Sequence, residues 1–151
     1  MHKHNKQFMK IWKQEFTLDG LLNVSSNTLV DNFDIKFVEA GDDYLVAEMP
    51  VTHKNVQPMR ILHGGASVAL AETVGSIGSA LCIENPMTHH AVGLEINANH
   101  LRSVPEGGKV RAKATAVHIG STTHIWQIDL TNEANKLVCT SRLTMMIRKA
   151  R

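Results

Sequence analysis

Cysteine is scarce in this chain, and its scarcity excludes a disulfide framework. The 151 residues include only two cysteines, Cys82 and Cys139, and both stand in apolar surroundings. Two cysteines cannot build the network of bridges that stabilises small secreted domains. We therefore expect both to be reduced core residues, which is consistent with a cytoplasmic location.

The chain also has no large excess of positive or negative charge and no long uninterrupted apolar run. The formal net charge is +2 and no long basic run occurs, so nucleic acid is not an expected partner. The basic start, residues 1–7, has no apolar segment after it, so we expect no secretory signal and assign these residues to a disordered head. The longest apolar stretch, residues 61–83, is interrupted by His63, Glu72 and several glycines and serines. It is therefore not expected to span a membrane.

Metal-binding motifs are absent as well. The nine histidines include the close pairs His2/His4 and His89/His90, but neither pair has a third ligand nearby at metal spacing. The sequence contains no HExxH or CxxC motif. We therefore expect no metal site.

Hydrophobic periodicity predicts one α+β domain over residues 8–151. Residues 8–24 have helical spacing with an interruption at residues 17–20, residues 34–51 alternate as a hairpin, and a helix of about 17 residues follows the glycine pair Gly64-Gly65. Alternating segments at 93–103, 110–117, 122–130 and 137–147 predict four more strands. One apolar helix with antiparallel strands predicts a curved sheet wrapped around a central helix.

Glu72 is the most informative residue of the predicted long helix. It is the only charged residue between Arg60 and Glu84, in an otherwise apolar or small segment. Burying an unpaired charge costs several kcal/mol, and a desolvated carboxylate tends toward a raised pKa suited to acid–base or nucleophilic chemistry. The alternative is a helix with one solvated edge, on which Glu72 lies.

Two serines share the helix face of Glu72. Ser76 stands one turn after Glu72 and Ser79 two turns after it, so helical spacing predicts a narrow polar stripe. The Ser76 hydroxyl could orient a water beside the carboxylate. Alternatively, it bonds only to the backbone one turn back.

The segment His63-Gly64-Gly65 precedes the same helix. Unpaired N–H groups at a helix start favour developing negative charge, and glycine lets a substrate approach the backbone. The alternative is a tight turn without a chemical role. Gly64 and Glu72 are eight residues apart in the sequence, or roughly 12 Å along a helix. If both act in one site, they must come from different subunits, so the catalytic interpretation predicts at least a homodimer.

Several segments, in order, carry a resemblance that extends from about Ile11 to Ile147. The most specific are residues 57–58, 62–67, 70–72, 92–100 and 118–121. Through them the chain resembles the hotdog-fold acyl-CoA thioesterases. The similar branch includes 1,4-dihydroxy-2-naphthoyl-CoA hydrolases of the menaquinone pathway, the enterobactin proofreading thioesterase and, more distantly, phenylacetate-pathway thioesterases.

The resemblance implies a reaction and an assembly. Two protomers would join their sheets, dimers would pair into a homotetramer, and an acyl-CoA would be hydrolysed without a separate cofactor. Glu72 corresponds to the catalytic carboxylate, acting as nucleophile or as general base, and the Gly64 N–H of the other protomer would hold the thioester oxygen. His63 and Gln57 match residues that position the thioester, and Ser76 matches the hydroxyl that orients water. The implied substrate and coenzyme A contacts are Gly93, His100, Leu101, Arg102, Ser103, His118, Ile119, Gly120 and Ser121.

The chain departs from this pattern between Gln57 and Leu62. Aryl-specific members usually carry an aromatic residue and a glycine there, where this chain has Met59, Arg60 and Ile61. An aryl-CoA such as dihydroxynaphthoyl-CoA or hydroxybenzoyl-CoA is still the favoured substrate. The alternatives are a hotdog-fold hydratase or dehydratase of enoyl thioesters, and a non-catalytic acyl-CoA-binding protein.

Overall fold

A six-stranded antiparallel sheet forms the frame of the molecule. A computed structural model describes residues 10–150, and the predicted disordered head at residues 1–7 lies outside this part. The strands follow the order β1-β2-β4-β5-β6-β3, and every neighbouring pair is antiparallel. Their bounds are β1 Lys36–Ala40, β2 Tyr44–Pro50, β3 His89–His100, β4 Lys109–Ile119, β5 Thr123–Asn132 and β6 Leu137–Lys149.

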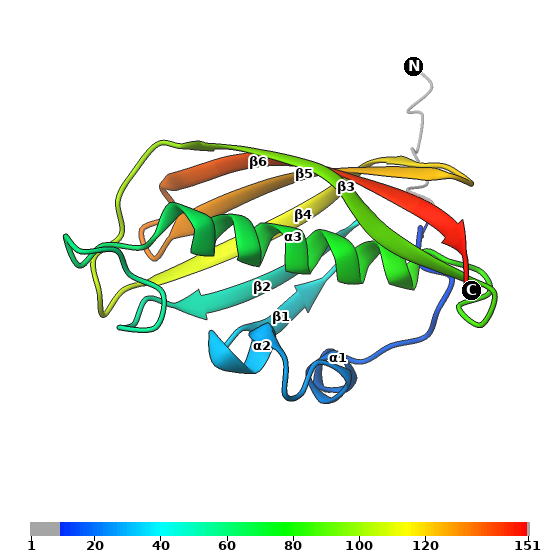
Figure 1. The fold of residues 1–151 in the computed structure, drawn as a ribbon, viewed down its shortest axis with the longest axis horizontal. Coiled ribbons are helices and arrows are strands. Elements are labelled where there is room, and N and C mark those ends of the chain that lie inside the picture. Colours follow the sequence, from blue (N-terminus) through cyan, green and yellow to red (C-terminus); the bar gives the residue numbers. More distant parts are fainter. Residues whose placement is uncertain (1–9, 151) are drawn as a thin grey trace, which may run out of the picture.

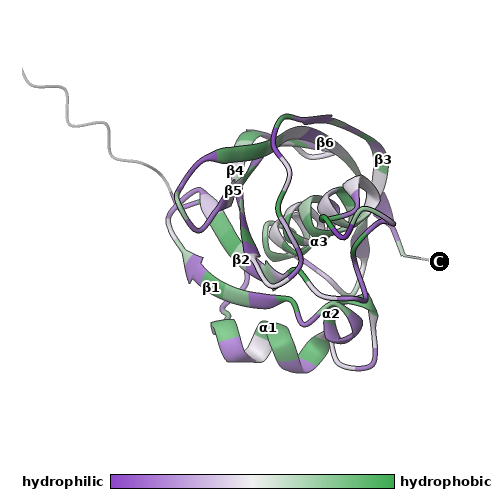
Figure 2. Ribbon diagram, turned by 90° about the vertical axis from the view of Figure 1, so that its left-hand side faces the viewer, coloured by the Kyte–Doolittle hydropathy of each residue, from purple (hydrophilic) through white to green (hydrophobic). Residues whose placement is uncertain are grey.

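The long helix α3, Gly64–Leu81, runs along the concave face of this sheet (Figure 1). Seen from its end, the sheet curls around the helix as an arc (Figure 2). Two glycines let the helix lie directly on the strands. A Cβ added at Gly75 would lie 2.5 Å from Leu143 Cδ2, and one at Gly78 would lie 2.9 Å from Trp126 Cη2. The expected α+β architecture, a curved antiparallel sheet around one central helix, is confirmed.

The predicted N-terminal helix is wrong over residues 10–17, and Phe8 lies outside the described residues. Helix α1 begins only at Leu18 and ends at Val24, after Thr17 caps it by accepting the Gly20 N–H. The apolar residues before α1 pack against parts of the chain that are distant in the sequence. Trp12 stacks on Trp126 with 6.3 Å between ring centroids, and its indole N–H donates to the Gly41 carbonyl (2.7 Å). These long-range contacts hold the segment extended despite its helical spacing.

A short second helix, α2 Leu29–Asn32, was not predicted, because four residues are too few to show a period. Together α1 and α2 lie beside β1, below α3 in Figure 1. The hairpin of β1 and β2 is confirmed, and the four later strands are confirmed with shifted ends. Strand β3 begins at His89, earlier than expected, because His89 pairs with Lys149 at the end of β6.

The described part of the chain also tests the expectations about cysteines and membrane spans. Cys82 and Cys139 are buried free thiols, as expected. Within residues 10–150, no helix is both long and apolar enough to cross a membrane.

Candidate active site

Helix α3 has one face that the sheet leaves partly open, with strand β3 at its edge. The residues of this open face are partly exposed, whereas Leu70 and Val74 on the opposite side are fully buried. The open face consists of Val68, Ala69, Glu72, Thr73, Ser76 and Ile77. Glu72 is therefore half-buried in the single chain and not cut off from water. The solvated-edge alternative describes its position, because the curved sheet wraps only one side of the helix.

The Glu72 carboxylate lies against the backbone of β3 at Gly93. A Cβ added at Gly93 would be 2.5 Å from Glu72 Oε1, closer than real Cβ contacts come. The pairing of β3 with β6 also shifts register between Gly93 and Glu95, which marks a β-bulge at this point. The missing side chain at Gly93 thus makes room for the carboxylate.

A cavity of about 500 Å³ opens beside Glu72, and we call it the Glu72 cavity. It lies between the α1–α2 segment and the open face of α3. Apart from Glu72 and a few hydroxyl groups, its walls are mostly apolar. They include Val24, Leu29 and Val30 on one side and Ala69, Glu72, Ser76 and Ile77 on the other.

The predicted serine stripe divides in two. Ser76 lines the Glu72 cavity, and its hydroxyl lies 3.7 Å from the sulfur of Met145. It does not bond the backbone one turn back; Thr73 makes that kind of bond instead, to the Ala69 carbonyl (2.7 Å). Ser79 is fully buried under β5 and accepts the Trp126 indole N–H (2.8 Å). Only Ser76 therefore shares the open surroundings of Glu72.

The start of α3 leaves one backbone donor without a partner among the residues that the structure describes. His63 is the N-cap: its Nδ1 accepts the Gly65 N–H (2.9 Å), and its carbonyl accepts the N–H of Ala66 (2.9 Å). The His63 N–H itself donates to the Asn55 carbonyl (2.9 Å). Among residues 10–150, no acceptor pairs with the Gly64 N–H. Because helix starts leave such donors free for capping groups or ligands, Gly64 offers a hydrogen bond to an incoming oxygen.

A second cavity, of about 440 Å³, lies at this end of the helix, and we call it the Gly64 cavity. The imidazole of His100 sits close to Gly64, because a Cβ added there would be 3.0 Å from His100 Nε2. Arg102 donates from Nη1 to the Leu137 carbonyl (2.6 Å). The cavity brings together most of the predicted residues of this region: Gln57, Gly64, His100, Leu101, Arg102 and Ser103.

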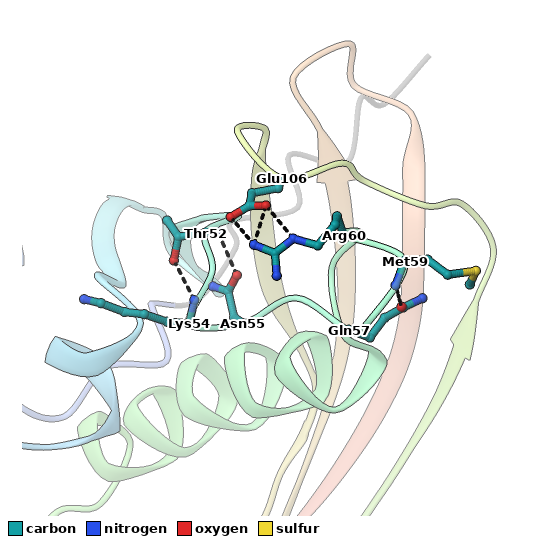
Figure 3. Close-up of polar contacts among 7 residues, drawn as sticks. All are labelled: Thr52, Lys54, Asn55, Gln57, Met59, Arg60 and Glu106. Carbon is teal, nitrogen blue, oxygen red and sulfur yellow. Dashed lines mark hydrogen bonds and ion pairs between the residues drawn. The ribbon is translucent and has the colours of Figure 1, made fainter.

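Hydrogen bonds and an ion pair hold the loop that contains Gln57 (Figure 3). Gln57 Oε1 accepts the N–H of Met59, and this bond holds the carboxamide in place. The NH₂ group of the carboxamide takes no part in the bond. Arg60 has φ 60°, the left-handed region that favours glycine. A glycine at this position would adopt the same conformation without strain.

The third group of predicted residues lies at the opposite end of α3. Ile119, Gly120 and Ser121 line a cavity of about 370 Å³ together with Cys82, which follows the last turn of the helix. His118 packs over the loop, since a Cβ added at Gly120 would be 2.6 Å from its Nε2. Sequence reasoning missed the other charged and histidine residues of this cavity, which are Lys13, Glu84, His89 and His124. These residues lie far apart in the sequence and belong to no common motif, so the sequence alone could not place them together.

His124 is the buried member of this group. Its Nδ1 lies 3.1 Å from Ser79 Oγ, which also accepts the Trp126 indole N–H. Burial lowers the pKa of His124, and a hydrogen bond with the Gly120 backbone partly opposes that shift. Because the Trp126 bond leaves the Ser79 proton available, Ser79 can donate to a neutral His124.

In one chain, the predicted catalytic residues do not form a single site. Gly64 and Glu72 lie on one continuous helix and line different cavities. Gln57 and His63 lie near Gly64, whereas Ser76 and Gly93 lie near Glu72. The structure thus supplies a carboxylate centre and a separate N–H donor centre within one chain.

Comparison with known proteins places this arrangement in a family. The sequence model of the thioesterase superfamily matches residues 59–139. A protein of Escherichia coli named 1,4-dihydroxy-2-naphthoyl-CoA hydrolase is 47% identical over 91% of this chain and 98% of its own. The chain belongs to the thioesterase superfamily, and its fold is the hotdog fold.

Solved structures agree with this assignment. A thioesterase from Pseudomonas aeruginosa superposes with a TM-score of 0.89 at 42% identity, covering 93% of this chain and 99% of that one. A thioesterase from Haemophilus influenzae gives a TM-score of 0.87 at 47% identity, covering 92% of this chain and 95% of that one.

Proposed function

We propose that this protein hydrolyses an acyl-CoA thioester to the free acid and coenzyme A, without a metal or other cofactor. One observation carries the proposal: the Glu72 carboxylate lies on the open face of α3, against the bare backbone of Gly93 and beside a mostly apolar cavity. Membership of the thioesterase superfamily supports the same reaction.

The chemistry divides between two protomers. Glu72 of one protomer acts on the thioester carbonyl, as nucleophile or as general base for water, and Ser76 orients the water. The Gly64 N–H of the other protomer, which has no acceptor within residues 10–150, holds the carbonyl oxygen as it gains charge, with Gln57 and His63 positioning the thioester. Because Gly64 and Glu72 line different cavities of one chain, the working unit is at least a homodimer, and we propose a tetramer of paired dimers.

Substrate parts are assigned to the cavities by their chemistry. The acyl group enters the Glu72 cavity, whose walls are mostly apolar. Gly93, His100, Leu101, Arg102 and Ser103 contact the thioester and pantetheine region, and the guanidinium of Arg102 suits a phosphate. Residues 118–121 contact the rest of coenzyme A.

An aryl acyl group is the favoured substrate. The support is the Escherichia coli relative, whose name specifies 1,4-dihydroxy-2-naphthoyl-CoA. Preference for that substrate would place the protein in menaquinone biosynthesis. The two buried free thiols support a cytoplasmic setting for this work.

The test is release of free thiol from acyl-CoAs by the purified protein, detected with a thiol reagent. Glu72→Ala should lose nearly all turnover while keeping its fold and oligomeric state, and the exposed Glu133→Ala is the matched control with wild-type turnover. Wild-type turnover in Glu72→Ala would refute the assignment. An enoyl-CoA that is hydrated with its thioester intact would indicate a hydratase, and binding without turnover would indicate an acyl-CoA-binding protein. Ranking aryl and alkyl acyl-CoAs by kcat/KM then identifies the acyl group.

A further inference from the structure

Arg60 holds an unfavourable backbone conformation and a close ion pair at the same time. Its φ of 60° lies in the left-handed region, which is strained for a residue with a side chain. Its guanidinium binds the Glu106 carboxylate through two hydrogen bonds, from Nε (2.9 Å) and Nη2 (2.7 Å). The Glu106 N–H also donates to the Arg60 carbonyl (3.0 Å). Figure 3 shows the pair joining the loop after β2 to the turn before β4.

The same turn determines where Gln57 lies. The Arg60 N–H donates to the Gln57 carbonyl (2.8 Å), and the Gln57 N–H donates to the Ile61 carbonyl (2.9 Å). The Gln57 side chain closes the turn by accepting the Met59 N–H. The bond from the Gln57 N–H to the Ile61 carbonyl spans Arg60, so it depends on the chain reversing at that residue. The left-handed conformation at Arg60 therefore helps to hold the Gln57 backbone, whose side chain lines the Gly64 cavity.

We propose that Arg60 and Glu106 form a positioning pair, which keeps Arg60 left-handed and thereby holds the Gln57 carboxamide in the Gly64 cavity. This inference rests on the proposed function, because it treats Gln57 as a residue that orients the thioester. The pair does not touch the reacting atoms. Its contribution is the geometry of the turn.

The Arg60–Glu106 ion pair is too exposed to contribute much to the stability of the whole fold. The side chain of Arg60 is 57% exposed and that of Glu106 is 34% exposed. Ion pairs with this exposure contribute little to the free energy of unfolding. Loss of the pair should therefore change the local turn and the catalytic rate much more than the unfolding temperature.

The sharpest test compares two substitutions at Arg60. Arg60→Ala and Arg60→Gly both remove the ion pair, but only glycine adopts a positive φ without strain. We expect Arg60→Ala and Glu106→Gln to lower kcat about tenfold with KM within about twofold, since displacement of a positioning group acts mainly on the rate. Arg60→Gly should stay within about threefold of wild type, because its turn survives without the pair. Equal activity of the alanine and glycine variants would overturn the proposal.

A second test asks whether the pair acts through Gln57. In a Gln57→Ala background, Glu106→Gln should cause no further loss of kcat, because the group it positions is already gone. Losses that multiply in the double variant would show an independent role and overturn the proposal.

A third readout does not need activity. Hydrogen–deuterium exchange of the backbone amides over residues 56–62 should accelerate in Arg60→Ala and stay near wild type in Arg60→Gly. Unchanged exchange in Arg60→Ala would overturn the inference even in an active enzyme. If the wild-type protein releases no thiol from any acyl-CoA, the proposed function fails, whereas this exchange experiment still decides whether the pair holds the turn.

Discussion

Glu72 and Gly93 occupy space that only one side chain can fill. Any other residue at position 93 would place its Cβ atom 2.5 Å from the Glu72 Oε1 atom, which is too close for two non-bonded atoms. The two residues come from the middle of α3 and from strand β3, which crosses it near that point. The bare backbone at Gly93 is therefore part of what sets the position of the carboxylate.

Gly93→Ala should displace the Glu72 carboxylate and lower kcat about 100-fold, because a shift of about 1 Å in a reacting group has effects of that size. Far-ultraviolet circular dichroism should show the fold retained. Gly107→Ala is the control, since Gly107 has φ 92° but no atom within 4 Å of an added Cβ. It should cost about 1–3 kcal/mol of stability and leave the turnover of the folded enzyme unchanged. Wild-type turnover in Gly93→Ala would mean that the carboxylate does not need this position.

The Gly64 N–H can be removed without breaking α3. Gly64 is the first helical residue, and His63 before it has φ −67° and ψ 130°, a conformation that a following proline accepts. Gly64→Pro should lower kcat about 10²–10³-fold by deleting one donor to the thioester oxygen. Gly64→Ala adds a similar clash with His100 but keeps the N–H, so it is the matched control. Equal losses in both variants would assign the effect to crowding of His100.

Mixed dimers test whether the site is shared between subunits. Consider a dimer of one Glu72→Ala chain and one Gly64→Pro chain. If the site is shared, one of its two sites combines the wild-type Glu72 of the second chain with the wild-type Gly64 of the first. Co-expressed chains with different tags should therefore recover about half of the wild-type activity, since one of two sites is intact. A site contained within one chain would stay inactive in every combination, so the absence of recovery would exclude the shared arrangement.

The buried His124 should make stability depend on pH. Burial lowers its pKa in the folded protein below the ordinary value of about 6.5. As pH falls, the unfolded chain therefore binds the proton first, so the stability is complete above about pH 6.5 and is lost as pH falls through the lowered folded pKa. Urea unfolding between about pH 5 and pH 8 should show this loss. His124→Gln should flatten the dependence, and the exposed His53→Gln should leave it as in wild type.

The thiol of Cys82 should resist alkylation in the folded protein. Burial raises its pKa to about 12, although Lys13 acts in the opposite direction. Because the thiolate is the reactive form, very little is present at neutral pH. Intact-mass spectrometry should detect no iodoacetamide adduct before denaturation and two adducts after it, the second on Cys139, which is also buried. An adduct formed rapidly in the native state would show that this end of α3 opens.

The sequence predicted best where the signal was local. The long helix and the alternating strands follow from periodicity within short windows. The N-terminal segment was wrong because its apolar residues serve distant contacts, as Trp12 does with Trp126. Ser79 was misplaced for the same reason, since β5 covers it while Ser76 stays open.

The sequence by itself determined that one helix carries a single carboxylate, and that an N–H donor of the same helix stands too far away to act with it in one chain. Both statements need only the helical rise and the identity of the residues. Only the tertiary structure decided which side of α3 the sheet covers, that Gly93 gives Glu72 its space, and that Glu106 supports the turn at Arg60. These relationships join residues far apart along the chain. Their geometry comes from the packing of whole elements, which local patterns do not encode.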